Sequence, residues 1–404
     1  MEILIVTPHF YPENFRINDL AKELNNRSHS ITVLTAIPDY PKGKYYTGYG
    51  LLKNNRENYN GVKVYRAPII PRGSGTRIRL ALNYFSFIIG SLFSCISLLR
   101  KNFDIILVFA PSPITVCIPA IIIKKIKGIP ICLWVQDLWP DSVAAAGNLK
   151  SNFIPNLIEP LVKFIYKHSD KILISSKGYK NSIVKKGISA SKIIFLPNWA
   201  ENVFRIIKSS NISFSFIPSN SFKIMFAGNI GIAQDFKAIL ESARMLKDKN
   251  VHWLILGNGS QKNWVKNKLK DYNLNHCFHL LGSYPTEKMP MYYSYADAML
   301  FALKDKYIFS LTLPSKVQSY LACGKPILAM INGEASDLIN NNNSGLVCSA
   351  GDSYGLSKNI LKMAKMTRNE LDLIGNNSLK CYKKNFDRKM LIDKIENILF
   401  SLIQ

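Results

Sequence analysis

Short runs of apolar, β-branched residues alternate with longer segments of helical periodicity along the whole chain. This alternation predicts βαβ units and parallel sheets, because a parallel strand needs a crossover connection before the next one. The runs are almost continuously apolar, which is typical of strands covered on both faces. The predicted strands of the first half are Glu2–Val6, Ser30–Thr35, Val62–Tyr65, Asp104–Phe109, Pro130–Val135, Lys171–Ser175 and Lys192–Leu196. The predicted helices are Phe15–Asn26, Ile78–Arg100, Ile114–Ile126, Phe153–His168 and Lys177–Lys185.

The same pattern starts again in the second half. Pro197-Asn198-Trp199 ends the first series, and the polar stretch Ser209–Ser221 is typical of a linker. The predicted strands are then Phe222–Ala227, Val251–Leu256, Cys277–Leu281, Ala298–Ala302 and Pro326–Met330. The predicted helices are Asp235–Leu246, Lys262–Lys270, Ser315–Ala322 and a terminal Lys389–Leu402. Because 404 residues exceed one hydrophobic core, we predict two α/β domains, with ligands in a cleft at the carboxyl ends of the strands.

One uncharged segment, Leu80–Leu99, is long enough to cross a bilayer. Small and polar residues recur in it at helical spacing, at Asn83, Ser86, Gly90, Ser94 and Ser97. The segment also separates two strands that should share a sheet, so we predict a packed or interfacial helix. Its flanking cations are Arg72, Arg77, Arg79, Arg100 and Lys101, which favour anionic lipid.

The amino-acid composition limits the classes of partner that the protein is expected to bind. The formal charge is +25, and residues 1–200 carry 26 Lys and Arg against 11 Asp and Glu. This excess favours anionic partners such as phosphorylated ligands or a membrane surface, although a Lys-rich solvated surface would give the same count. No nucleic-acid-binding motif accompanies the charge. The seven scattered cysteines and an N-terminus that begins with a strand, without the pattern of a signal peptide, predict a reduced, cytoplasmic protein.

Two glycine-rich turns in the second half are candidates for phosphate binding. Gly228, Asn229, Gly231 and Gln234 follow one predicted strand, and Gly257 and Gly259 follow the next. Such turns let backbone N–H groups approach a phosphate at a helix N-terminus, although tight βα turns also use glycine for structural reasons. Ser315 and Lys316 begin a later helix after Pro314, where a lysine opposes the helix dipole unless an anion lies nearby. An ordinary surface lysine is the alternative.

The first half offers polar residues at strand ends. Gln136 and Asp137 follow the strand Pro130–Val135, and Asp137 is a candidate to accept a hydrogen bond from a substrate hydroxyl or to cap the next helix. Arg16 lies in the first turn of the first helix, where it faces a ligand or pairs with Glu13 or Asp19. His9 is a lone histidine, which is more often structural than catalytic.

The motifs at 228–234, 256–259, 281–285 and 322–327, together with Tyr11–Ala21 and Trp134–Pro140, resemble a family-4 retaining glycosyltransferase of the GT-B fold. The nearest subgroup is the WbuB-like transferases of bacterial O-antigen and capsule synthesis. The resemblance implies two Rossmann-like, doubly wound domains that face a cleft. Their expected bounds are 1–200 for the acceptor-side domain, 201–385 for the nucleotide-sugar domain, and 386–404 for a helix that packs back on the first domain.

The resemblance also implies the reaction. A sugar, such as N-acetylfucosamine, moves from a nucleotide donor, expected to be UDP-linked, to a polyprenyl-diphosphate-linked saccharide with its anomeric configuration retained. The donor-binding residues would be Gly228, Asn229, Gly231, Gln234, Gly257, Gly259, Tyr284, Ser315, Lys316 and Ser319, and the acceptor-binding residues Glu13, Arg16 and Gln136. Lys316, Asp137 and Arg16 are expected to carry the catalysis, with no metal and no cofactor. The expected location is peripheral, on the inner face of the bacterial cell membrane.

The chain departs from the family at its charged donor positions. The family's Arg and Lys of the phosphate site read Asn229 and Gln234 here, its two glutamates fall at Leu311 and Ser319, and its histidine falls at about Gln136. Lys316 and Arg16 are therefore the candidates to neutralise the diphosphate. These departures leave two other functions open: a sugar-nucleotide epimerase of the same architecture, and a non-catalytic protein that binds lipid or polyanions.

Overall fold

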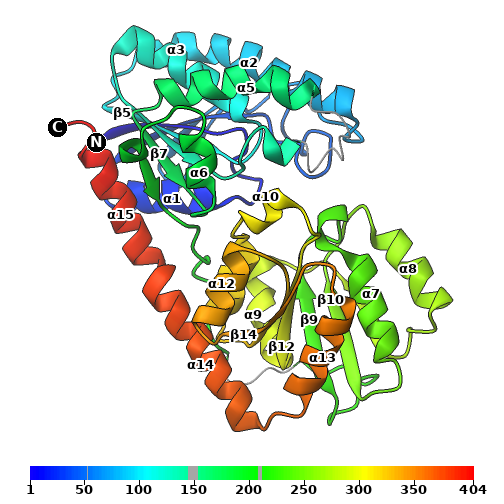
Figure 1. Cartoon of the computed structure of the whole chain (residues 1–404). Helices are drawn as coiled ribbons and strands as arrows, with labels where there is room; N and C mark the ends of the chain where they lie inside the picture. Colours follow the sequence, from blue (N-terminus) through cyan, green and yellow to red (C-terminus); the bar gives the residue numbers. More distant parts are fainter. Residues whose placement is uncertain (52, 144–152, 208–211) are drawn as a thin grey trace. The chain divides into compact units, whose positions relative to one another are not determined.

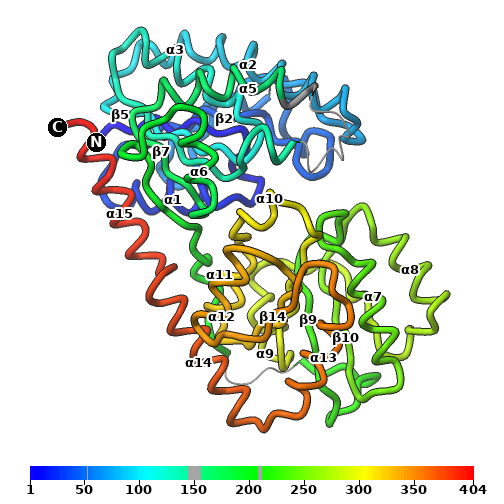
Figure 2. The backbone as a smooth tube through the Cα atoms, viewed as in Figure 1, coloured from blue at the N-terminus to red at the C-terminus, as the bar shows by residue number. Residues whose placement is uncertain are grey.

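The computed structural model describes residues 1–51, 53–143, 153–207 and 212–404. It contains two compact units (Figure 1). Unit 1 consists of Met1–Leu196 and the terminal Ile392–Gln404, and unit 2 consists of Pro197–Leu391. The chain therefore leaves unit 1 at Leu196 and returns to it through its last helix, which the tube in Figure 2 follows to the C-terminus.

Unit 1 is built on an eight-stranded sheet with the order β3-β4-β2-β1-β5-β6-β7-β8. All neighbouring pairs are parallel except β3 with β4. The strands are β1 Glu2–Val6, β2 Ser30–Ala36, β3 Arg56–Tyr59, β4 Val62–Ala67, β5 Ile105–Ala110, β6 Ile131–Val135, β7 Lys171–Ile174 and β8 Ile193–Phe195. The edge strand β3 is missing from the sequence prediction because its residues, Arg-Glu-Asn-Tyr, are polar.

The helices of unit 1 cover both faces of this sheet (Figure 1). They are α1 Arg16–Asn26, α2 Arg77–Leu99, the short η1 Ile114–Val116, α3 Cys117–Lys127, α5 Phe153–His168, α6 Tyr179–Val184, η2 Ala190–Lys192 and α15 Arg388–Phe400. The predicted helix Ile114–Ile126 is thus a short 3-10 turn followed by α3. Within unit 1, α15 is fixed to the first domain, because Glu396 accepts hydrogen bonds from Arg27 (2.7 Å) and His29 (2.6 Å).

Unit 2 has a six-stranded parallel sheet with the order β11-β10-β9-β12-β13-β14. Its strands are β9 Phe222–Ala227, β10 Val251–Leu256, β11 Phe278–Gly282, β12 Ala298–Ala302, β13 Ile327–Met330 and β14 Gly345–Cys348. Its helices are η3 Ile232–Gln234, α7 Phe236–Met245, α8 Lys262–Asp271, η4 Thr286–Lys288, α9 Met289–Tyr295, α10 Tyr307–Ser310, α11 Ser315–Ala322, α12 Glu334–Asn341, α13 Ser353–Ala364 and α14 Arg368–Asn385. The sequence prediction lacked β14 and most helices after β13.

The predicted linker Ser209–Ser221 is wrong in its described part. Residues 208–211 lie outside the described residues, but Ile217 is buried in the core of unit 2. The Phe214 ring also packs edge-on against Tyr295, with ring centroids 5.4 Å apart. Ile212, Phe214 and Ile217, three apolar side chains within a serine-rich stretch, therefore belong to the core of the second domain. The chain passes between the units at Leu196–Pro197.

Helix α2, which contains the uncharged segment Leu80–Leu99, packs on unit 1 as predicted. Among the described residues it is the one helix that is long and apolar enough to cross a membrane. Its small and polar positions face the domain: Gly90 lies so close to the Pro68 carbonyl that a methyl group there would be 2.1 Å from the oxygen. The Ser86 hydroxyl accepts a hydrogen bond from the Ile70 N–H (2.8 Å), and Arg56 donates to Ser97 (2.9 Å). The strands before and after it, β4 and β5, share one sheet.

Candidate functional sites

Lys316 is a buried cation in unit 2 without a counter-ion. It lies in the first turn of α11, after Pro314, and its Nζ has no hydrogen-bond partner among the described residues. Nζ makes a cation–π contact with the ring of Phe226, whose centroid is 4.1 Å away. Burial lowers the pKa of Lys316 to about 7. An unpaired buried cation is costly for a folded protein, so the arrangement indicates a site that an anion completes.

Gly228 makes room for this lysine. It follows β9, at the carboxyl end of the sheet, and its φ of +137° is a conformation that side chains rarely adopt. A methyl group at Gly228 would lie 2.5 Å from Cε and 2.7 Å from Nζ of Lys316. The sheet order reverses between β9 and β12, and ligands of open α/β sheets bind at such a switch point. The Lys316 ammonium is therefore located where this class of fold binds its ligand.

The two glycine-rich turns pack against each other. A methyl group at Gly257 would lie 1.8 Å from the Gly228 carbonyl oxygen, and one at Gly259 would lie 2.4 Å from that of Ile230. Both glycines are thus required by close packing of the backbone, which is the structural alternative that the sequence left open. Gln234 also has a local role, because its Oε1 accepts a hydrogen bond from the Gly231 N–H (3.1 Å).

The other residues expected to bind the donor have contacts of their own. Asn229 belongs to the packed turns, since its amide lies 2.5 Å from a methyl group built on Gly231. Tyr284 is half-buried and packs against the Tyr292 ring, with centroids 4.4 Å apart. Ser315 is exposed at the start of α11, and the Ser319 hydroxyl donates weakly to the Ser315 carbonyl (3.5 Å).

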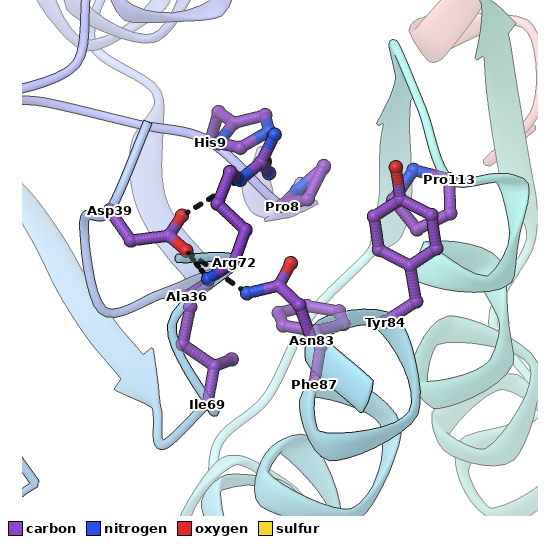
Figure 3. Close-up of a pocket in the computed structure, with 10 residues that line it drawn as sticks. All are labelled: Pro8, His9, Ala36, Asp39, Ile69, Arg72, Asn83, Tyr84, Phe87 and Pro113. Carbon is purple, nitrogen blue, oxygen red and sulfur yellow. Dashed lines mark hydrogen bonds and ion pairs between the residues drawn. The ribbon is translucent and has the colours of Figure 1, made fainter. Parts of the chain in front are cut away.

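Unit 1 contains a small pocket, with room for about one water molecule, that the sequence prediction missed. It lies at the carboxyl ends of β4, β2, β1 and β5, next to the inner side of α2 (Figure 3). The sheet order of unit 1 reverses between β1 and β5, so this pocket also lies at a switch point. Its polar side chains are His9, Asp39, Arg72, Asn83 and Tyr84.

Glu13, an acceptor-binding candidate from the sequence, is buried next to the pocket. Its Oε1 accepts hydrogen bonds from the N–H groups of Asp39 (2.8 Å) and Tyr40 (2.6 Å), and its Oε2 is 2.7 Å from Nδ1 of His9. The carboxylate therefore holds the wall of the pocket together. His9 is correspondingly not a lone histidine.

Arg72 was expected among the cations that flank the segment Leu80–Leu99 and favour anionic lipid, but its side chain lies in the pocket. The backbone N–H of Arg72 donates to Asp39 Oδ2 (2.8 Å), and its Nε lies 3.4 Å from Asp39 Oδ1. Its Nη2 is 3.3 Å from Nε2 of His9, and its guanidinium lies over the Tyr40 ring, 5.0 Å from the centroid. The guanidinium belongs to the pocket.

Asp137 follows β6 in unit 1, and burial raises its pKa to about 7. It does not cap a helix, because helical conformation begins only at Asp141. Its carboxyl group is one of the charges that act on Tyr84, so it lies near the pocket. Gln136 uses its backbone carbonyl to accept hydrogen bonds from Ser175 (3.4 Å) and Tyr179 (3.2 Å). Arg16 is half-buried at the start of α1.

Comparison with known families identifies the fold and the reaction class. Residues 14–199 match the family described as "Glycosyl transferase 4-like domain", and residues 208–380 match "Glycosyl transferases group 1". The chain belongs to the family-4 GT-B glycosyltransferases. It is accordingly an enzyme that transfers sugars, which confirms the prediction from the motifs and argues against the epimerase and the non-catalytic alternative.

Named relatives agree with this membership. The chain is 27% identical over 350 residues to the putative colanic acid biosynthesis glycosyl transferase WcaI of Escherichia coli, covering 83% of this chain and 84% of that protein. It is 24% identical to the probable glycosyltransferase WbjE of Pseudomonas aeruginosa, over 68% of each chain. Among solved structures, Anabaena HepE in complex with UDP and glucose has a TM-score of 0.71 at 15% identity, with all of both chains covered. This likeness confirms the GT-B fold.

Proposed function

We propose that this glycosyltransferase moves a sugar from a UDP-linked donor to a polyprenyl-diphosphate-linked saccharide, with retention, in bacterial surface polysaccharide synthesis. The observation that carries the proposal is the buried, unpartnered ammonium of Lys316 against Gly228. A donor diphosphate would supply the missing anion, and Lys316 would take the place of the Arg and Lys that this chain lacks at the family's phosphate site. The relatives support the setting, since WcaI is named for colanic acid biosynthesis and HepE was solved with UDP.

The chemistry follows from the charge that develops on the leaving group. As the anomeric C–O bond to the diphosphate breaks, its electron pair passes to the diphosphate, and the acceptor oxygen attacks from the same face. The acceptor hydroxyl gives its proton to a phosphate oxygen, so no protein nucleophile is required. A lysine already buried at that position stabilises the departing charge without prior reorganisation. We expect this reaction to proceed without a metal ion, and unchanged turnover after exhaustive chelation is the check.

A screen of nucleotide sugars tests the donor directly. A ligand that binds only the folded state raises the melting temperature. We expect UDP and one or a few UDP-sugars to stabilise the wild type, and we expect Lys316→Met to lose most of this stabilisation. Stabilisation by another nucleotide series would refute the UDP assignment. Proton coupling constants across the new glycosidic bond then decide the stereochemistry, and an inverted product would refute retention.

The outer side of α2 supports a peripheral location on an anionic membrane. Ile78, Phe85 and Phe93 expose 75%, 62% and 69% of their surface, although they are large and apolar. They belong to one helical stripe with Leu82, Ile89, Leu92 and Ile96, and exposed Arg77, Arg79 and Arg100 lie at the two ends of the helix. A patch of this kind is typical of helices that lie in the interface of a bilayer.

Vesicle co-sedimentation tests this location. The wild type should bind vesicles that contain anionic lipid, and binding should weaken as salt screens the arginines. The double variant Phe85→Ser/Phe93→Ser should lose binding at all salt concentrations, whereas Leu373→Ser, on exposed α14, should not. Retention that survives both high salt and alkaline carbonate would mean that α2 spans the bilayer, contrary to the proposal.

A further inference from the structure

The diphosphate of the proposed donor carries more negative charge than one lysine balances. Both of its phosphate groups are ionised at neutral pH, and further charge develops on the leaving group as the bond to the sugar breaks. Lys316 supplies one positive charge, and Asn229 and Gln234 in the adjacent glycine-rich turn are neutral. A second cation at the same edge of the sheet would therefore bind the diphosphate and stabilise it as it departs.

Lys304 lies at this edge of the sheet. It follows β12, which ends at Ala302, and β12 is the neighbour of β9 at the point where the strand order of unit 2 reverses. The backbone N–H of Lys304 donates a hydrogen bond to the carbonyl oxygen of Ala233 (2.9 Å). Ala233 belongs to the glycine-rich turn that starts at Gly228, and Gly228 makes room for Lys316. Lys304 is therefore fixed against the turn on which the donor site is built.

The side chain of Lys304 is free to bind a ligand. It is half-buried, and its ammonium has no hydrogen-bond or ion-pair partner in the part of the chain that the structure describes. The carboxylate of the next residue, Asp305, accepts a hydrogen bond from the side chain of Asn332 (3.2 Å). A lysine whose backbone is fixed and whose ammonium has no partner can bind an anion without giving up a contact within the protein.

One short segment joins Lys304 to Lys316. It passes through α10 and is held near its middle by the turn after β13, because a methyl group on Gly333 would lie 2.0 Å from the carbonyl oxygen of Ser310. Figure 1 shows α10 beyond the end of the sheet of unit 2. The backbones of both lysines are thus set by packing against the turns after β9 and β13 before a ligand binds.

We propose that Lys304 is a second cation of the donor site and that its ammonium binds the diphosphate together with Lys316. This inference rests on the proposed function, because it concerns the same donor, and it adds a binding residue that the sequence prediction did not include. The ammonium of Lys316 is buried, whereas Lys304 is only half-buried. Because solvent screens an accessible charge more than a buried one, the contribution of Lys304 should be the smaller of the two.

Binding of UDP and of uridine to variants of Lys304 tests the proposal, because the two ligands differ only in the diphosphate. Isothermal titration calorimetry would measure the binding of UDP, and saturation-transfer NMR the weaker binding of uridine. We expect Lys304→Met to weaken UDP binding about tenfold and to leave uridine binding unchanged. Lys304→Arg, which keeps the positive charge, should retain most of the affinity for UDP. Lys306→Met, at an exposed lysine of the same segment, is the matched control and should bind UDP as the wild type does.

The outcomes separate this inference from the proposed function. Unchanged UDP affinity in Lys304→Met, at an unchanged melting temperature, would overturn the inference and leave the donor assignment standing. An equal loss of UDP and uridine binding would also overturn it, since the residue would then act on the nucleoside or on the fold. If the wild type bound another nucleoside diphosphate in place of UDP, and this binding depended on Lys304, the UDP assignment would be refuted and the second cation confirmed. A wild type that binds no nucleoside diphosphate would refute both.

Discussion

Lys316 in unit 2 and Arg72 in unit 1 are both cations at the carboxyl ends of parallel strands, but their surroundings differ. Arg72 has Asp39, His9 and the Tyr40 ring as partners. Nζ of Lys316 lies over the Phe226 ring and has no hydrogen-bond partner in the part of the chain that the structure describes. A compensated cation directs hydrogen bonds, and an uncompensated one attracts charge. The difference supports the proposal that Lys316 in unit 2 meets the anionic part of the donor.

A second lysine makes the comparison sharper. Lys325 is also buried in unit 2, and burial lowers its pKa to about 8. Its Nζ, however, donates hydrogen bonds to the carbonyl oxygens of Ser294 (3.1 Å) and Ala296 (2.7 Å). Lys325 is thus a structural lysine whose donors are used within the protein. Both ammonium groups are buried, but that of Lys316 has no hydrogen-bond partner among the described residues.

The largest expected effect is on turnover. Lys316→Met removes the cation from the departing diphosphate while keeping most of the apolar volume, and we expect turnover to fall about a hundredfold. Steady-state kinetics with the donor found in the thermal screen is the measurement. Lys325→Met is the matched control, and it should retain turnover. Near-normal turnover in Lys316→Met would remove the main support for the donor site, and Arg16 would be the next candidate.

Only part of these two sites could be predicted from the sequence. Strand periodicity and glycine spacing predicted the sheets, the donor-side turns and the position of Lys316, because these depend on local pattern. The unit 1 pocket combines His9 and Glu13 with Asp39 from the next strand end and Arg72 from a loop 63 residues after His9. Such pairings are set by strand order, which periodicity does not give. The polar strand β3 was missed for the related reason that packing, rather than pattern, fixes it. Helix α14 was missed although it begins with a capping box, Thr367 and Glu370, that is present in the sequence.

Replacing each of the two lysines by methionine should change the free energy of unfolding in opposite directions. Lys316 has a folded-state pKa of about 7, below that of an unfolded lysine, so the unfolded chain binds more protons between about pH 7 and pH 10.5. Burial of the charged ammonium therefore lowers the free energy of unfolding in full below pH 7, and this destabilisation decreases as pH rises from about 7 to about 10.5. We expect Lys316→Met to raise the free energy of unfolding by about 2 kcal/mol at pH 7 in urea titrations. Lys325→Met should lower it, since two buried carbonyls lose their donor.

The pH dependence of UDP binding is a smaller, independent test. A diphosphate favours the charged ammonium, so binding raises the pKa of Lys316 and takes up a proton wherever the free site is neutral. Above pH 7 the affinity for UDP should therefore decrease, by about tenfold between pH 7 and pH 8.5. Calorimetry in buffers of different ionisation enthalpy measures the proton uptake directly. We expect the UDP affinity of Lys316→Met to be independent of pH. If the wild type also showed an affinity independent of pH, Lys316 would not contact the diphosphate.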